Sequence, residues 1–233
     1  MTTKKKSLVP AKKQATQNSK KSPTYTISEL AINQLKGHIS QLCKHARDCD
    51  LDGKLIISVF GENPDTGKAL PPVVKHFSPN KQQDIIEFIL QKTTRLHSNV
   101  YMPPVLMRPD LAQGKKGGEK DIVAVLGLVA DFDDDDAKNW KERIPIEPSY
   151  VLETSPDRFQ VGFLLQEPME PEEAKLLAQA LKIYCHCDHG TADTSHVWRT
   201  PGTLNWPNKK KADAGRLLDP WEVKLVEGKM NTV

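Results

Sequence analysis

Long hydrophobic runs are absent from this sequence of 233 residues. A helix that crosses a bilayer needs about 20 consecutive apolar residues, and no stretch approaches that length. The N-terminus carries lysines without a hydrophobic stretch behind them, so the pattern of a secretory signal peptide is missing as well. We therefore expect a cytoplasmic protein without a membrane partner, whose cysteines are reduced.

Cysteine is also scarce. The four cysteines form a C-x5-C pair at Cys43 and Cys49 and a C-x-C pair at Cys185 and Cys187. Structural zinc sites usually use C-x2-4-C spacing, which neither pair has. Buried, unpaired thiols are therefore favoured over a zinc site.

Acidic residues are missing from residues 1–24, which contain seven lysines among Ser, Thr, Gln and Pro. This composition buries too little apolar surface to offset the entropy of ordering, so we predict a disordered basic tail. Its charge would favour nucleic acid through counterion release, although a solubilising tail explains the composition equally well. The net charge is only +3, so residues 25–233, the predicted folded domain, are slightly acidic as a whole.

Apolar periodicity divides this domain into helices and strands. Helical spacing predicts helices at about 28–46, 79–96 and 171–185. The predicted inward side of the last helix consists of Leu176, Leu177, Ala180, Leu181 and Tyr184. Apolar runs predict strands at 54–60, 73–77, 99–108, 122–131, 149–153, 159–165 and 223–226.

The order of these elements indicates the fold class. Strands and helices interleave, yet hairpins recur, so an α+β fold with a mostly antiparallel sheet is favoured over a doubly wound one. The strand at 122–131 is apolar throughout and should be buried on both faces. Pro103 and Pro104 should confine the strand at 99–108 to an edge or a bulge.

The buried strand runs directly into five carboxylates within six residues, in the stretch VADFDDDD. Side chains alternate along a strand, so Asp131 and Asp133 should share a face. Two neighbouring carboxylates resist ionising together unless a cation lies between them, and hard divalent ions prefer oxygen ligands. Residues 134–136 suit the positive end of a following helix without any metal. On this short pattern alone, a metal site and a plain acidic turn are equally good interpretations.

A second polar block covers residues 188–205, DHGTADTSHVWRTPGTLN. It contains Asp188, Asp193, Arg199 and a Pro-Gly turn before Asn205. An arginine in such a cluster is suited to hold a phosphate through two parallel hydrogen bonds. Between the two blocks, residues 154–160 (TSPDRFQ) form a polar turn that leads into an apolar strand.

In this order the three blocks resemble the archaeo-eukaryotic primase, or primase-polymerase, superfamily, and most of all the RepB-type primases of plasmid replication. LVADFD at 128–133 matches a hydrophobic strand that enters Asp-x-Asp, and TSPDRFQ matches the turn that follows. Asp188, with RTPGTLN at 199–205, matches the last motif. The resemblance covers roughly residues 30–215. It implies a catalytic core on an RRM-like, mostly antiparallel sheet with flanking helices.

The resemblance also implies a two-metal site. Two Mg²⁺ or Mn²⁺ ions would be held by Asp131, Asp133 and Asp188, lowering the pKa of the attacking hydroxyl and neutralising charge on a triphosphate. The spacing to Arg199 favours Asp188 over Asp193 as the third ligand. The residues implied in nucleotide binding are Ser155, Arg158, Gln160, Arg199 and Asn205. Gln160 stands where many members have a histidine, although the RepB-type branch also has glutamine.

Four further residues are candidates for contacts with nucleic acid. Lys115 and Lys116 lie in a basic loop at 113–120, which would contact template phosphates or remain solvated. Lys209 is the first lysine after Asn205, where family members often place one, but extra residues intervene. Trp206 would stack on a base or plug the sheet.

The function implied is that of a DNA primase. It would synthesise or extend primers from nucleoside triphosphates on single-stranded DNA, during replication of a plasmid, phage or mobile element. A separate replicative helicase or initiator is a further partner that family habit suggests. The alternative is an inactive replication-initiation or DNA-binding module with the same fold, against which the retained aspartates argue. A nuclease or relaxase would need a histidine cluster or paired tyrosines, and the sequence has no His-x-His pattern or suitably paired tyrosines. A glycosyltransferase that uses Asp-x-Asp would leave the Arg-x-Pro-Gly turn without a role.

Overall fold

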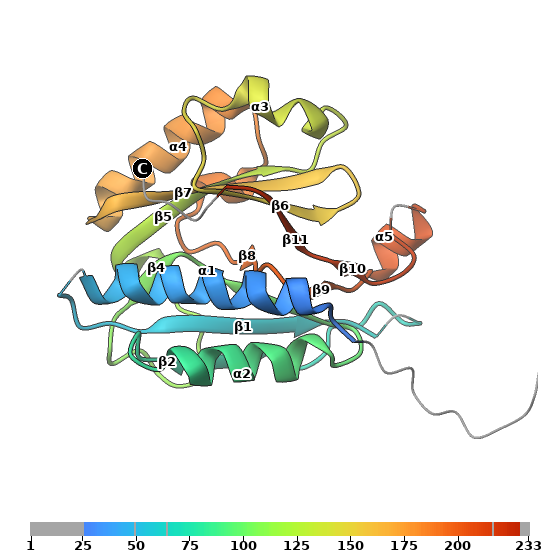
Figure 1. Ribbon diagram of the computed structural model, residues 1–233, viewed down its shortest axis with the longest axis horizontal. Helices are drawn as coiled ribbons and strands as arrows, with labels where there is room; N and C mark the ends of the chain where they lie inside the picture. The colour runs from blue at the N-terminus through green and yellow to red at the C-terminus, as the bar shows by residue number, and fades with distance from the viewer. Residues whose placement is uncertain (1–25, 49, 64, 216, 229–233) are drawn as a thin grey trace, which may run out of the picture.

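The computed structural model describes residues 26–48, 50–63, 65–215 and 217–228 (Figure 1). The expected α+β fold is confirmed: helices flank antiparallel strands, which are divided between two larger sheets and one two-stranded sheet. None of the helices in the described ranges is long and apolar enough to span a membrane. The predicted disordered tail at 1–24 lies outside the described residues.

The first sheet has four strands in the order β2-β1-β3-β8. Its strands are β1 (Leu55–Gly61), β2 (Val73–Phe77), β3 (Ser98–Met102) and the short β8 (Trp198–Arg199). The predicted β1–β2 hairpin is confirmed, with Leu55 opposite Phe77. Helices α1 (Glu29–Asp48) and α2 (Gln82–Thr93) contact one another beside this sheet (Figure 1). Helix α2 begins later than predicted, because the Lys81 N–H bonds the Ser78 carbonyl in a turn.

The second sheet has five strands in the order β11-β6-β7-β5-β4. They are β4 (Val105–Met107), β5 (Ile122–Phe132), β6 (Tyr150–Ser155), β7 (Arg158–Met169) and β11 (Lys224–Glu227). Helix α4 (Pro171–Cys185) covers one face of it. Helix α1 packs between the two sheets, because its buried Leu35 and Ile39 share a core with Ile57 of β1 and Leu126 of β5. Strand β5 is buried over most of its length, as its unbroken apolar sequence predicts.

Short elements complete the chain. They are the 3₁₀ helices η1 (Glu119–Asp121), η2 (Ala137–Asn139) and η3 (His189–Ala192), the helices α3 (Trp140–Arg143) and α5 (Lys209–Asp213), and the paired strands β9 (Leu204–Asn205) and β10 (Trp221–Glu222). The acidic residues 134–136 therefore precede η2 and α3, and the helix predicted after them is only two short turns.

The strand predicted at 99–108 is two strands that belong to different sheets. Strand β3 ends before Pro103, and β4 begins after Pro104. Only β4 is an edge strand, whereas β3 lies between β1 and β8, so the edge assignment is wrong for the first half. The two prolines lack N–H donors and occupy the crossover, where neither sheet needs those donors.

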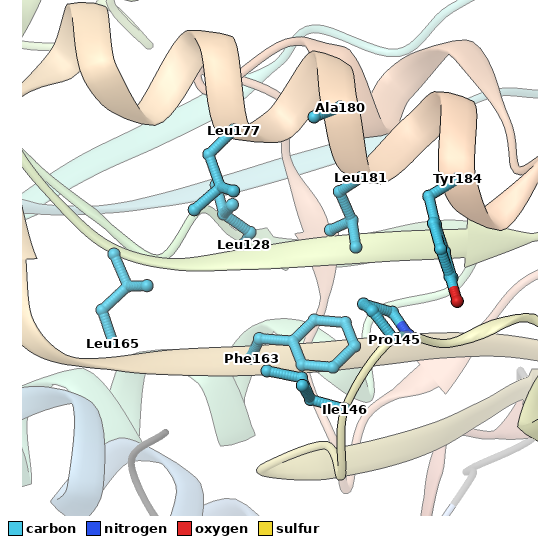
Figure 2. A pocket seen from close by; sticks show the side chains of 9 residues that line it. All are labelled: Leu128, Pro145, Ile146, Phe163, Leu165, Leu177, Ala180, Leu181 and Tyr184. Carbon is cyan, nitrogen blue, oxygen red and sulfur yellow. The ribbon is translucent and has the colours of Figure 1, made fainter.

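The inward face predicted for α4 is largely wrong. Its fully buried residues are Ala174, Ala178 and Cys185, with Leu181 nearly so. Leu176 is 68% exposed and Tyr184 is 61% exposed. The apolar arc of this helix is wider than the sheet can cover, and the small alanines allow the closest approach. The remaining apolar side chains border a groove of about 310 Å³ between α4 and the sheet (Figure 2), lined by Leu128, Pro145, Ile146, Phe163, Leu165, Leu177, Ala180, Leu181 and Tyr184.

The thiols agree with the sequence prediction as far as the structure describes them. Cys43, Cys185 and Cys187 are free, and the first two are buried. Burial raises the pKa of the Cys43 thiol to about 11, with the nearby Arg47 opposing the shift. Cys49 lies outside the described residues.

Candidate active site

The carboxylate of Asp131 lies at the end of β5 in an unfavourable electrostatic position. Asp131 stands opposite Gln160 on β7. Burial raises the pKa of Asp131 to about 7, and the charges of Asp133 and Asp188 add to the shift, whereas a hydrogen bond from Gln160 and the charge of Lys211 oppose it. Carboxylates from two distant segments therefore act on one another at a single point.

Backbone hydrogen bonds bring Asp188 to this point. The Asp188 N–H donates to the Asp131 carbonyl at 2.9 Å, and the Asp131 N–H donates to Thr191 Oγ1 at 3.1 Å. Asp188 also caps η3, where its Oδ1 accepts from the Gly190 N–H at 3.1 Å. The start of η3 is thus joined to the end of β5, and Asp188 is exposed at the junction.

Asp193, the alternative third carboxylate, is bonded within a turn of its own. Its Oδ1 accepts from the Ser195 N–H at 2.9 Å and from Ser195 Oγ at 2.8 Å. Lys116 Nζ donates to the Ser195 carbonyl at 3.0 Å, which fastens the basic loop to this turn. One N–H donor of this amine is therefore used within the protein, and the predicted contact of Lys116 with template phosphate stays a prediction. Lys115 is exposed, and its contact with template stays a prediction.

The acidic residues suit a divalent cation by their chemistry but are not yet arranged around one. In the described part of the chain, no group of three or more His, Cys, Asp or Glu side chains is already arranged to hold a metal ion. The positive charge next to Asp133 comes instead from Arg158. Its Nε lies 3.2 Å from Asp133 Oδ1, and its Nη2 lies 3.3 Å from Asp135 Oδ1. The donor set of Asp131, Asp133 and Asp188 nevertheless suits a hard cation, since all its ligands are carboxylate oxygens.

A cavity of about 190 Å³ opens beside Asp133. Three residues predicted from the sequence line it, namely Asp133, Ser155 and Arg158. It also contains Lys211, Pro156, Asp157 and Leu217. Two cationic side chains therefore face one cavity at the edge of the acidic cluster, which is a chemically suitable place for phosphate.

Lys211 is a site residue that sequence reasoning missed. Lys209 was expected instead, but its Nζ pairs with Asp213 at 3.0 Å and its N–H bonds the Glu62 carboxylate. Helix α5 starts after Asn208, whose Oδ1 accepts from the Lys211 N–H at 2.7 Å. Lys211 is the third lysine of the run, and its charge acts on the Asp131 carboxylate. An asparagine before three lysines was the only available signal.

Gln160 connects Asp131 to the first sheet. Its side chain bonds the Asp131 carboxylate, and its Oε1 accepts from the Arg199 N–H at 3.0 Å. The Arg199 side chain points elsewhere: Nη1 donates to Asn99 Oδ1 at 2.7 Å, and the guanidinium lies 4.5 Å from the centre of the Tyr101 ring. Arg199 therefore contributes its backbone to the acidic cluster, while its charge lies over β3.

Two residues predicted to contact substrate are buried. Trp206 is 3% exposed, packs its ring on His97 and has Nε1 3.5 Å from the Thr93 carbonyl, so it cannot stack on a base. This burial agrees with the alternative interpretation that Trp206 plugs the sheet. Asn205 is 2% exposed and donates to the Thr154 carbonyl at 2.6 Å. This bond holds the end of β6 next to the β6–β7 turn. The burial of Asn205 contradicts the prediction that its side chain contacts a nucleotide.

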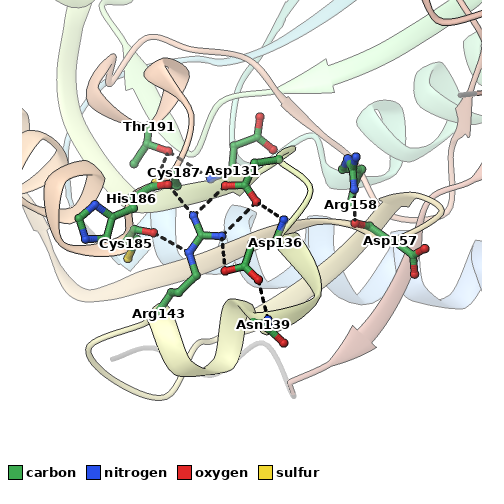
Figure 3. A network of polar contacts seen from close by, with 11 residues as sticks. Asp131, Asp136, Asn139, Arg143, Asp157, Arg158, Cys185, His186, Cys187 and Thr191 are labelled. Carbon is green, nitrogen blue, oxygen red and sulfur yellow. Dashed lines mark hydrogen bonds and ion pairs between the residues drawn. The ribbon is translucent and has the colours of Figure 1, made fainter. Parts of the chain in front are cut away.

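A second missed residue is Arg143, at the end of α3. Its guanidinium bonds the carbonyls of Cys185 and His186 (Figure 3). It also bonds the Asp134 carboxylate. It thereby bridges the acidic turn and the end of α4. Nothing in its local sequence indicates this contact, because the two partners are separated by β6, β7 and α4.

The chain is similar to proteins of known family and structure. Residues 116–232 match the family described as the RepB DNA-primase N-terminal domain. That span is just over half of the chain and includes Asp131, Asp133 and Asp188. The chain belongs to this family. None of the curated proteins matches it.

Solved structures show the same fold as this RepB-type primase domain. The crystal structure of primase RepB′ is similar with a TM-score of 0.52 and 18% identity, covering 85% of this chain and 58% of that chain. The catalytic domain of primase Repb′ in complex with initiator DNA gives a TM-score of 0.53 and 16% identity, covering 88% of each chain. The AEP domain of the cyanophage S-2L primase-polymerase gives 0.53 and 13%, covering 83% of this chain and 91% of that one. The expected archaeo-eukaryotic, RepB-like primase fold is confirmed.

Proposed function

We propose that this RepB-type domain is a metal-dependent nucleotidyltransferase that synthesises or extends primers on single-stranded DNA. The observation that carries the proposal is the position of Asp131. Its carboxylate, with a pKa raised to about 7 by burial and by Asp133 and Asp188, lies beside the positive charge of Lys211. A carboxylate in such a position is suited to a bound cation, which would favour its ionised form.

In this proposal Asp131, Asp133 and Asp188 hold two Mg²⁺ or Mn²⁺ ions. Such ions supply charge neutralisation on the triphosphate and a more acidic attacking hydroxyl. Arg158 would leave Asp133 and turn toward the phosphates, together with Lys211 and Ser155 in the same cavity. Gln160 orients the Asp131 carboxylate through the bond between their side chains.

The proposed partners are a single-stranded DNA template and nucleoside triphosphates. The similar Repb′ catalytic domain was solved with initiator DNA, which supports a DNA substrate for this chain. Exposed Lys115 remains the proposed template contact. Replication of a plasmid, phage or mobile element, with a separate helicase or initiator, is part of the same proposal.

A second candidate is a DNA-binding module that no longer synthesises. The ion pair between Arg158 and Asp133 favours it, because this pair satisfies one carboxylate without a metal. The two candidates differ in whether Asp131 and Asp188 are needed for product formation.

The test is primer synthesis on single-stranded DNA with labelled nucleotides and Mn²⁺ or Mg²⁺. We expect product from the wild type, and a loss of about 10²-fold or more in Asp131→Asn and Asp188→Asn, as for removal of groups that stabilise charge in the transition state. Asp193→Asn is the matched control and should retain synthesis. DNA binding without any product from the wild type would favour the binding module.

A further inference from the structure

We propose that Arg143 is a positioning residue that fastens the turn carrying Asp133 to the segment carrying Asp188. The proposal rests on the proposed function, because it concerns the separation of carboxylates that would share metal ions. Arg143 itself would touch neither metal nor substrate.

One side of the contact is the acidic turn. Arg143 Nη1 lies 3.1 Å from Asp134 Oδ1, and Nη2 lies 2.9 Å from Asp134 Oδ2. The arginine side chain is only 13% exposed, whereas Asp134 is 46% exposed, so the two-point ion pair has a buried cation and a carboxylate at the surface. Asp134 directly follows Asp133 in the chain.

The other side is the end of α4. Arg143 Nε donates to the Cys185 carbonyl at 3.0 Å, and Nη2 also donates to the His186 carbonyl. Carbonyls in the last turn of a helix lack intrahelical partners, and a cation there is favoured by the helix dipole. His186 adopts a left-handed conformation with φ of 49° as the helix ends. Asp188 follows two residues later.

The guanidinium of Arg143 also lies against an aromatic ring. Its central carbon lies 4.7 Å from the centre of the Phe132 ring, and Phe132 is fully buried. The flat fork of arginine can stack on this ring while its N–H groups reach both sides. A lysine retains the charge but has neither the planar face nor the fixed fork. Arginine therefore has a specific structural reason to stand here.

The consequence is a fixed space between two carboxylates. A cavity of about 280 Å³ is lined by residues of both segments that Arg143 joins, namely Asp133, Asp134, His186, Cys187, Asp188 and His189. Asp188 is separately tied to Asp131 by its backbone. Loss of Arg143 should therefore loosen the turn that carries Asp133, which then keeps only its ion pair with Arg158, and widen this space, while Asp131 and Asp188 stay together.

The experiment compares Arg143→Lys with the wild type by Mn²⁺ binding, followed by electron paramagnetic resonance without nucleotide or DNA. Outer residues that orient metal ligands typically contribute about 10- to 100-fold to affinity, so we expect Mn²⁺ binding weaker by that factor. Hydrogen exchange should become faster at residues 133–136 and 185–189. Asp134→Ala, which removes the exposed end of the same contact, should shift both measurements in the same direction. It keeps the test valid even where Arg143→Lys fails to fold.

Lys141→Ala is the matched control. Lys141 lies on the same short helix and forms an exposed ion pair with Glu227 at 2.9 Å, so its loss should leave Mn²⁺ binding and exchange at wild-type values. If the wild type synthesises primers and Asp134→Ala binds Mn²⁺ as tightly as the wild type, the positioning role is overturned and the proposed function stands. A wild type that neither binds Mn²⁺ nor synthesises would instead overturn the proposed function, and this inference with it.

Discussion

At the scale of single residues, ionisation of Asp131 opposes folding when no cation is bound. Burial, followed by the charges of Asp133 and Asp188, raises its pKa from 3.8 to about 7. Between these two values the folded protein keeps a proton that the unfolded chain has released, so the contribution of Asp131 to stability falls as pH rises. The effect is at most a few kcal/mol, since one pKa unit corresponds to about 1.4 kcal/mol.

Asp131→Asn removes this titration. In urea unfolding with a chelator present, the stability of Asp131→Asn relative to wild type should increase as pH is raised from 4 to 7, because only the wild type loses this contribution. Mn²⁺ added at pH 8 should then stabilise the wild type more than the variant. Asp65→Asn, in the exposed β1–β2 loop, is the control and should follow the wild-type curve. Parallel pH curves for wild type and Asp131→Asn would contradict the raised pKa.

The same scale shows which site residues the sequence predicts. Asp131 and Asp133 follow from alternation along one strand, which is a local rule. Asp188 was available only through family resemblance, because its approach to β5 depends on a bond between backbones distant in sequence. Lys211 and Arg143 were missed because side-chain direction in such short helices is set by tertiary contacts.

At the scale of elements, α4 is the clearest case in which periodicity gave the right span and the wrong face. The helix boundaries at 171 and 185 are those predicted, because Pro171 begins the helix and the apolar spacing continues to Cys185. Leucines outnumber alanines on one side, so hydrophobicity favoured that side. In the structure the alanines pack against the sheet instead, since only small side chains permit a close approach of helix and sheet.

This packing predicts opposite outcomes for two alanines of α4. Ala178 is fully buried against the sheet, so Ala178→Leu should cost about 1–3 kcal/mol through overpacking. Ala180 borders the open groove, where leucine finds space, and Ala180→Leu should change the free energy of unfolding by about 0.5 kcal/mol or less. Thermal or urea unfolding measures both. Equal destabilisation by the two substitutions would contradict the observed face.

At the scale of the whole molecule, the α+β class and most strands were predictable because each hairpin is a local pattern. The division of the strands into two sheets could not be predicted. A Pro-Pro pair is equally consistent with a bulge in one strand as long as the strands that pair with each half are unknown. The site forms where segments from β5, the β6–β7 turn, η3 and α5 converge. Only the complete fold specifies that arrangement.

Charge distribution carries the last prediction at this scale. Residues 1–24 hold seven lysines and no acid, while the whole chain has a net charge of only +3, so the remainder is slightly acidic. DNA binding by that remainder alone should therefore depend on a few local cations such as Lys115. Each phosphate neutralised on a single strand adds about −0.7 to the slope of log K against log salt. Deleting residues 1–24 should weaken binding to single-stranded DNA and flatten this slope.

Replacing the seven tail lysines with glutamine is the matched control for this deletion, because it keeps the length of the chain. Fluorescence anisotropy with labelled single-stranded DNA at several salt concentrations measures both variants. Equal losses in the deletion and the glutamine variant would show that charge is responsible. If the salt slope is unchanged in both variants, the tail lysines serve solubility and not DNA binding. The DNA affinity would then have to come from cations of the folded domain close to the site, such as Lys115, Arg158 and Lys211.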